Sequence, residues 1–147
     1  MSPYGRQSID DDDVAAVVEV LRSDWLTQGP TVERFERSLA DEVGARHAVT
    51  FSSGTAALHG AAAAAGFGEG DLVVTSPLTF MATANCVRYV GARPGLVDID
   101  PSTWNLDLAA VPDHVRGVIP VHYAGLPVVF DAWQPAGPVS YTHLRAH

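Results

Sequence analysis

The sequence of 147 residues contains no lysine, because all nine of its basic residues are arginines. Arginine stays protonated in proteins and is a poor nucleophile, so it cannot replace a lysine amine in covalent catalysis. Positive charge is also scarce overall, and the formal net charge is −8. That balance excludes a general nucleic-acid binder, because neutralising phosphates requires clustered basic side chains.

Cysteine and long apolar runs are also lacking. A single cysteine, Cys86, excludes an intrachain disulfide and favours a reducing compartment. No apolar run approaches the roughly 20 residues of a membrane-spanning helix, and the opening MSPYGRQSIDDDD lacks the apolar stretch of a signal peptide. We therefore expect a cytoplasmic protein without a membrane segment or a metal site. The hydrophobic content of 47% is ordinary for a globular chain.

The first third of the chain predicts two amphipathic helices. Ser8-Ile9-Asp10-Asp11 resembles a capping box, and the helix behind it should run to Arg22. The acidic run 10–13 is either a binding patch or a first helical turn favoured by the helix dipole. Residues 23–30 read as a loop because of their Gly-Pro signal, and the second helix should end at Gly44. The two predicted apolar faces consist of Val14, Val17, Val18 and Leu21, and of Val32, Phe35, Leu39 and Val43.

The pattern then changes to alternating strands and helices, which indicates an α/β fold. Strands joined through helices imply crossover connections and a mostly parallel sheet with helices on both faces. A turn at residues 100–103 should follow the third strand. A further helix should begin near residues 131–133 and is interrupted by Pro135. The predicted strands are residues 48–51, 72–75, 94–99 and 115–121, and the predicted helices are residues 55–65 and 80–90.

Three hydroxyls and a glycine lie between the first predicted strand and its helix, in the stretch Ser52-Ser53-Gly54-Thr55. A helix N-terminus offers unpaired backbone N–H groups and partial positive charge, and in an α/β sheet it faces the ligand crevice. Residues 53–56 are therefore well suited to hold a phosphate. The alternative is that Ser53 is only a helix cap. The stretch matches neither a P-loop nor GxGxxG, which favours a single phosphate on a small cofactor.

The next strand-to-helix junction, TSPLTFM, brings Phe80 to a helix start. This junction should open at the same edge of the sheet. The ring of Phe80 is then either a surface that stacks on another aromatic ring or an ordinary core side chain.

Five segments in this order resemble the sugar aminotransferases of the DegT/DnrJ/EryC1/StrS family, and the resemblance extends from about residue 3 to Trp133. The opening, residues 3–30, is most similar to the branch that makes UDP-4-amino-4,6-dideoxy-N-acetyl-β-L-altrosamine, a precursor of pseudaminic acid. The segments are LTQGPTVERFE (26–36), SSGTAALHGAAAAAG (52–66), TSPLTFMATANCVRYVGARP (75–94), VDIDPSTWNLD (97–107) and VIPVHYAGLP (118–127).

The resemblance implies a pyridoxal 5′-phosphate enzyme of the aspartate-aminotransferase fold, type I. Such enzymes aminate keto groups of nucleotide-activated sugars, usually with glutamate as amino donor, and work as homodimers. The implied phosphate cradle is Ser53, Gly54, Thr55 and Ala56, and the implied ring-stacking residue is Phe80. The implied contacts with the sugar nucleotide are Tyr4, Asp24, Trp25, Leu26 and Thr27. His122 and Tyr123 match no family role, and we expect them to be structural.

The family holds its cofactor as a Schiff base on a lysine, which also moves the proton during transfer. An aspartate protonates the pyridine nitrogen. The resemblance matches neither residue to this chain, and Asp131 corresponds to an earlier helix start. We therefore predict that the chain as written holds no catalytic residue, shows no imine absorbance with the cofactor and transfers no amino group.

These implications divide the chain into three parts. Residues 1–30 should form an N-terminal helix and an active-site loop, and residues 31–133 part of the cofactor-binding large domain. Residues 134–147 should be a tail foreign to the family, because VSYTHLRAH resembles translated sequencing-adapter DNA. A truncated gene is thus one interpretation, and a short protein kept for binding is the other.

Two other functions remain open. The chain could be part of a dehydratase of the same fold, in which a histidine replaces the lysine. It could also be a non-enzymatic α/β binding module. A sharp, reversible thermal transition in a monomer would favour the binding module, because an incomplete sheet exposes apolar edges and should aggregate.

Overall fold

The computed structural model of the chain describes residues 7–130, 140–141 and 144–145. Tyr4 and the helix expected near residues 131–133 lie outside the described residues. The chain forms two compact units, residues 1–50 and 51–147. No helix in the described part is long and apolar enough to cross a membrane.

The first unit contains the two predicted helices, α1 (Asp11–Arg22) and α2 (Pro30–Glu42). The cap of α1 is not Ser8 but Asp10, whose carboxylate accepts hydrogen bonds from the backbone N–H groups of Asp12 and Asp13, both at 3.0 Å. The Asp13 carboxylate accepts from the Asp10 N–H at 3.1 Å, which completes a capping box. The acidic run is therefore a helix start, the second of its two interpretations.

The end of α2 agrees with the prediction, since Gly44 adopts a φ of +65° after its last turn. The strand expected at residues 48–51 is wrong, because that stretch has no strand partner among the described residues. The segment is tied to α2 instead: the Glu36 carboxylate accepts from the N–H and the hydroxyl of Thr50, both at 2.8 Å.

The apolar faces of α1 and α2 are mostly exposed, and among the residues of the two helices only Ala40 is buried. These exposed side chains include Val14, Val17, Leu21, Phe35 and Leu39.

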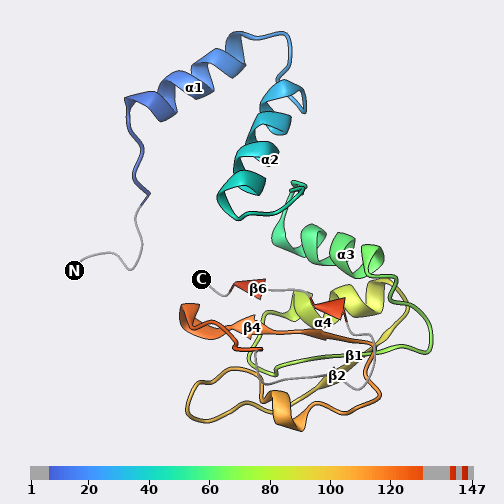
Figure 1. Ribbon diagram of the computed structural model, residues 1–147. Helices are drawn as coiled ribbons and strands as arrows, with labels where there is room; N and C mark the ends of the chain where they lie inside the picture. The colour runs from blue at the N-terminus through green and yellow to red at the C-terminus, as the bar shows by residue number, and fades with distance from the viewer. Residues whose placement is uncertain (1–6, 131–139, 142–143, 146–147) are drawn as a thin grey trace. The chain divides into compact units, whose positions relative to one another are not determined.

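The second unit is built on a parallel sheet with the strand order β2-β1-β3-β5. This confirms the α/β class. Figure 1 shows two of its neighbouring strands, β1 and β2. The strand β1 (Leu72–Thr75) matches its prediction, whereas β2 (Arg93–Leu96) ends earlier than expected. The expected fourth strand is divided into β3 (Gly117–Ile119) and β4 (Val121–His122) because Pro120 between them has no N–H to donate. The short strands β5 (Ser140–Tyr141) and β6 (Leu144–Arg145) pair in parallel with β3 and β4.

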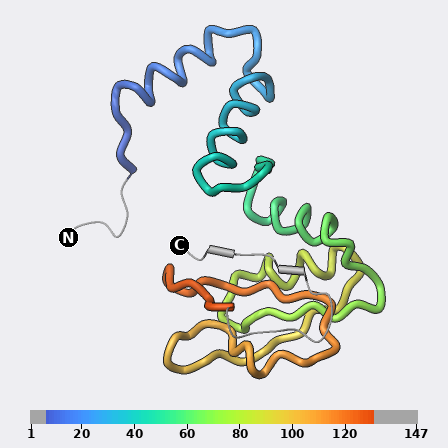
Figure 2. Tube along the Cα trace, viewed as in Figure 1, coloured from blue at the N-terminus to red at the C-terminus, as the bar shows by residue number. Residues whose placement is uncertain are grey.

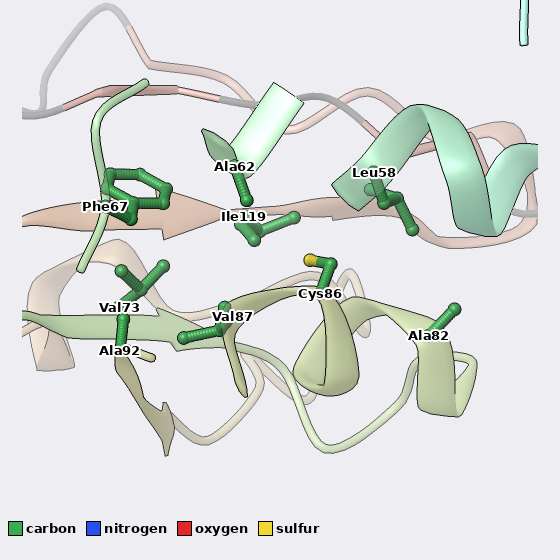
Figure 3. Packing of buried hydrophobic residues seen from close by; sticks show 9 residues of the cluster. All are labelled: Leu58, Ala62, Phe67, Val73, Ala82, Cys86, Val87, Ala92 and Ile119. Atoms are coloured by element: carbon green, nitrogen blue, oxygen red, sulfur yellow. The ribbon is translucent and has the colours of Figure 1, made fainter. Parts of the chain in front are cut away.

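One face of the sheet is covered by α3 (Gly54–Ala64) and α4 (Met81–Tyr89), close to the predicted helices. Figure 3 shows the core that forms there between the two helices and the strands. Its members are Leu58, Ala62, Phe67, Val73, Ala82, Cys86, Val87, Ala92 and Ile119.

The opposite face is covered by the long connection between β2 and β3 (Figure 2), which includes the 3₁₀ turn η1 (Leu108–Ala110). Val74 and Val118 lie on this face, while their neighbours Val73 and Ile119 lie on the other, as strand alternation requires. The turn expected at residues 100–103 is present, with the Asp100 carboxylate accepting from the N–H and hydroxyl of Ser102.

Candidate functional site

The turn at the start of α3 has the geometry of an open helix N-terminus. Ser53 is the N-cap, with extended backbone angles, and its Oγ accepts from the N–H of Ala56 at 3.2 Å. The first intrahelical bond runs from the N–H of Ala57 to the carbonyl of Ser53 at 2.9 Å. The backbone N–H groups of Gly54 and Thr55 lie in the first turn of the helix, where no intrahelical acceptor is available to them.

Gly54 leaves space in front of these groups. A Cβ built at Gly54 would meet no atom within 4 Å, and residues 52–55 are all exposed. An anion can therefore approach the backbone of the first turn closely, with the hydroxyls of Ser53 and Thr55 beside it. The structure confirms that Ser53 is a helix cap, and the turn that it begins is exposed.

Phe80 is the N-cap residue of α4, and its side chain is 71% exposed. Phe80 belongs to neither hydrophobic cluster of the described chain, so it is not an ordinary core side chain. The turn before it is fixed by short hydrogen bonds. The N–H of Leu78 donates to Ser76 Oγ at 3.0 Å, and the hydroxyls of Thr79 and Thr83 lie 2.7 Å apart.

The starts of α3 and α4 lie at the same edge of the sheet. In Figure 3, Leu58 near the start of α3 and Ala82 near the start of α4 occupy one end of the core, and the strands through Val73 and Ile119 point toward that end. This is the carboxyl edge, where α/β folds bind ligands. The structure thus brings the turn at residues 53–56 and the helix start at Phe80 to one edge.

The carboxyl edge is held together by a buried bond between neighbouring strands. The hydroxyl of Thr75, the last residue of β1, donates to the carbonyl of Ile119, the last residue of β3, at 2.7 Å. Thr75 is 1% exposed. This bond fixes the strand ends from which the two neighbouring loops depart.

The residues that the resemblance assigns to the sugar nucleotide come from the first part of the chain. Asp24, Trp25, Leu26 and Thr27 belong to the first unit and are all exposed, and Tyr4 lies outside the described residues. Their loop has a defined local shape. Ser23 Oγ accepts from the N–H of Trp25 at 3.2 Å, and a Cβ at Gly29 would lie 2.8 Å from the Cβ of Trp25.

His122 and Tyr123, which match no family role, make structural contacts. His122 Nδ1 accepts from the N–H of Val128 at 3.0 Å, so a neutral ring carries its hydrogen on Nε2. Tyr123 stacks on Trp104 with ring centroids 5.9 Å apart and planes 19° apart. Its N–H donates to Asn105 Oδ1 at 2.9 Å.

Sequence reasoning missed Asn105, which is 5% exposed and joins this turn to the preceding connection. The only signal was an asparagine between Trp104 and Leu106 in the segment VDIDPSTWNLD, and asparagine is common in exposed turns as well. Among the described residues, no group of three or more His, Cys, Asp and Glu could hold a metal ion.

Comparison with known proteins gives the context for this geometry. The sequence profile of the DegT/DnrJ/EryC1/StrS aminotransferase family matches residues 7–137. The spore coat polysaccharide biosynthesis protein SpsC of Bacillus subtilis is 46% identical over 134 residues, which are 88% of this chain and 34% of that protein. The UDP-4-amino-4-deoxy-L-arabinose–oxoglutarate aminotransferase of Shewanella sediminis is 40% identical over the same shares of both chains.

A solved structure shows the same fold. Spr1654 of Streptococcus pneumoniae, described as a sugar aminotransferase and solved in PMP and PLP forms, superposes with a TM-score of 0.80 at 32% identity. The comparison covers 88% of this chain and 34% of that one. This chain therefore spans about a third of the length of these relatives. The match over residues 7–137 shows that it belongs to the DegT/DnrJ/EryC1/StrS aminotransferase family.

Proposed function

We propose that this chain is the cofactor-holding N-terminal part of a pyridoxal 5′-phosphate-dependent sugar aminotransferase. The observation that carries the proposal is that the open turn at residues 53–56 and the exposed Phe80 begin two helices, α3 and α4, whose starts lie at one edge of the sheet. A phosphate needs the first feature and a flat aromatic ring needs the second. Family membership supplies the cofactor that combines both.

In this proposal the chain's own residues bind and orient. The N–H groups of the first turn of α3 and the hydroxyls of Ser53 and Thr55 donate to the phosphate, and the helix dipole favours its negative charge. The exposed ring of Phe80 would stack on the pyridine ring. The bound cofactor supplies an electron sink for electrons released at a substrate carbon.

The substrate proposal is a nucleotide-activated keto sugar, with glutamate as amino donor. The finer proposal, a UDP-linked 4-keto-6-deoxy-N-acetylhexosamine on the route to pseudaminic acid, rests on the likeness of residues 3–30 to that branch. Here Tyr4 and the loop of Asp24, Trp25, Leu26 and Thr27 would contact the sugar nucleotide. We also propose that the complete enzyme is a cytoplasmic homodimer.

The proposal assigns no proton transfer to this chain. With no lysine among its residues, it has no side-chain amine to link to the cofactor or to move a proton. The chain should therefore bind pyridoxal 5′-phosphate reversibly. Gel filtration should then remove the cofactor.

The decisive test compares Gly54→Ala with the unchanged chain. Alanine at this position meets no atom within 4 Å, so the variant should fold normally, and helix propensity favours it slightly. A methyl group in front of the first turn should instead obstruct the phosphate. We expect the affinity for pyridoxal 5′-phosphate to fall about tenfold, the loss that follows from one or two weakened charge-assisted hydrogen bonds.

The matched control is Gly68→Ala, which also meets no atom within 4 Å and lies outside the turn. It should leave the affinity unchanged. Pyridoxal, which lacks the phosphate, should bind equally weakly to all three proteins. Equal affinity of the unchanged chain for pyridoxal and for its phosphate would overturn the proposed cradle.

A further inference from the structure

The side-chain amide of Asn105 is buried and forms hydrogen bonds with one distant turn. Its Oδ1 accepts from the N–H of Tyr123 at 2.9 Å, and its Nδ2 donates to the carbonyls of Leu126 at 3.1 Å and Pro127 at 3.4 Å. The partners lie 18 to 22 residues further along the chain. The amide therefore uses both its acceptor and its donor side to hold the turn that follows β4.

That turn requires stabilising contacts because its backbone is strained. Ala124 adopts a φ of +50°, in the left-handed region that non-glycine residues rarely occupy. The N–H of Leu126 donates to the carbonyl of Tyr123 at 2.9 Å, and the Val128 N–H is bound to His122 Nδ1. This conformation turns the carbonyls of Leu126 and Pro127 toward the Asn105 amide.

The loop that presents Asn105 is itself fixed. The backbone carbonyl of Asn105 accepts from the N–H of Asp100 at 2.9 Å. The residue before it, Trp104, has a φ of +62°, unusual for an aromatic side chain, and its N–H donates to the carbonyl of Asp100 at 2.7 Å. The Trp104 ring stacks on Tyr123 and connects the two segments a second time.

The turn lies where the chain leaves the carboxyl end of the sheet. β3 ends at Ile119, whose carbonyl is bound to Thr75 at the end of β1, and β4 continues beyond Pro120 to His122. The turn thus follows β3 and β4, and β3 is the neighbour of β1, the strand that leads to Phe80. We propose that Asn105 is a positioning residue, whose amide fixes the turn at residues 123–127 so that it forms a wall of the crevice on the ring side of the cofactor.

An asparagine meets this requirement better than its closest substitutes. Aspartate would keep the acceptor for Tyr123 but would place a carboxylate against two carbonyl oxygens, with no hydrogen to donate. Leucine would leave one N–H and two carbonyls without their partners in a buried place. Both changes release the carbonyl end of the turn, and only leucine also releases Tyr123.

The inference rests on the proposed function for the ligand, and the test separates the two. Asn105→Asp, Asn105→Leu and the unchanged chain are titrated with pyridoxal 5′-phosphate and, separately, with inorganic phosphate. Amide hydrogen exchange of Tyr123 and Val128 is measured in parallel. Asp107→Asn is the control, since Asp107 lies in the same connection and its side chain caps η1 by accepting from the N–H of Ala109.

We expect both Asn105 variants to bind pyridoxal 5′-phosphate about tenfold more weakly while inorganic phosphate binds as before, because the turn borders the ring and not the phosphate. Tyr123 should exchange faster in Asn105→Leu than in Asn105→Asp. A purely structural role would weaken both ligands together or neither, and either result overturns the inference. If the unchanged chain binds no pyridoxal 5′-phosphate, the proposed function fails and the inference falls with it.

Discussion

The ring of Phe67 lies directly over Gly117, so that the end of the ring occupies the space that a Cβ of Gly117 would need. Phe67 is 5% exposed and belongs to the core between α3, α4 and the sheet (Figure 3), and Gly117 begins β3. The glycine is thus required by its neighbour and not by its backbone angles, since its φ is not in the left-handed region. The contact fixes the connection after α3 against the amino end of β3.

Gly117→Ala should therefore destabilise the second unit by about 1–3 kcal/mol, the usual cost of overpacking a well-packed core. Urea unfolding followed by circular dichroism measures the change. The double variant Phe67→Leu/Gly117→Ala should lose less than the sum of the two single variants, because the smaller side chain makes room for the methyl group. Additive losses would show that the ring is not what excludes a side chain at this position.

Cys86 should report on opening of the same core. Its thiol is 0% exposed and donates to the carbonyl of Thr83 at 3.1 Å, and burial raises its pKa above the ordinary value of 9.0. We expect Ellman's reagent to react with the native chain far more slowly than with the chain in urea. Since the sequence contains one cysteine, the whole signal comes from this site. Rapid reaction of the native chain would contradict the buried placement.

The raised pKa of Cys86 also gives a pH dependence with a definite sign. The fold favours the protonated thiol, so the native chain binds more protons than the unfolded chain above the ordinary thiol pKa of 9.0. The contribution to the free energy of unfolding is complete below that pH and is lost as the pH rises through the higher pKa of the folded state. Cys86→Ser keeps a donor for Thr83 but has no such titration, so its stability should decline less steeply in alkali.

The pH dependence that comes from Glu36 should have the opposite sign to that from Cys86. Its carboxylate accepts hydrogen bonds from the backbone N–H and from the hydroxyl of Thr50. Both bonds lower the pKa of Glu36 below the ordinary 4.5, and the bond from the backbone N–H has the larger effect. The stabilisation that these hydrogen bonds provide is complete above that pH and is lost as the pH falls through the lower pKa of the folded state. The amide proton shift of Thr50 should follow this titration. Glu36→Gln should abolish it, and Glu42→Gln on the same helix should not.

The sequence predicted most of the second unit because its signals are local. Gly66 and Gly91 follow α3 and α4 with positive φ, and apolar runs mark the buried strand β1. The turn at residues 53–56 and the place of Phe80 at a helix start were predicted for the same reason. Chain punctuation and periodicity carry this information directly.

The errors arose where distant partners decide. Residues 48–51 have strand-like composition, but their carboxylate partner, Glu36, lies on the preceding helix, and propensity cannot reveal this. The division of the fourth strand depends on the missing N–H of Pro120. The role of Asn105 could not be predicted because the hydrogen-bond partners of its side chain lie up to 22 residues away. Long-range polar contacts of this kind leave no periodic trace in a sequence.

Phe80 allows a final prediction that separates ring recognition from phosphate recognition. Because its side chain is 71% exposed, Phe80→Ala should hardly change the free energy of unfolding. It should weaken pyridoxal and pyridoxal 5′-phosphate by the same factor, about five- to tenfold, which corresponds to the roughly 1 kcal/mol of an aromatic stacking contact. Gly54→Ala should weaken only the phosphate form. Met81→Ala is the matched control, since Met81 is the next residue and is 70% exposed. Equal effects of the Phe80 and Met81 substitutions would show that the ring has no specific contact with the cofactor.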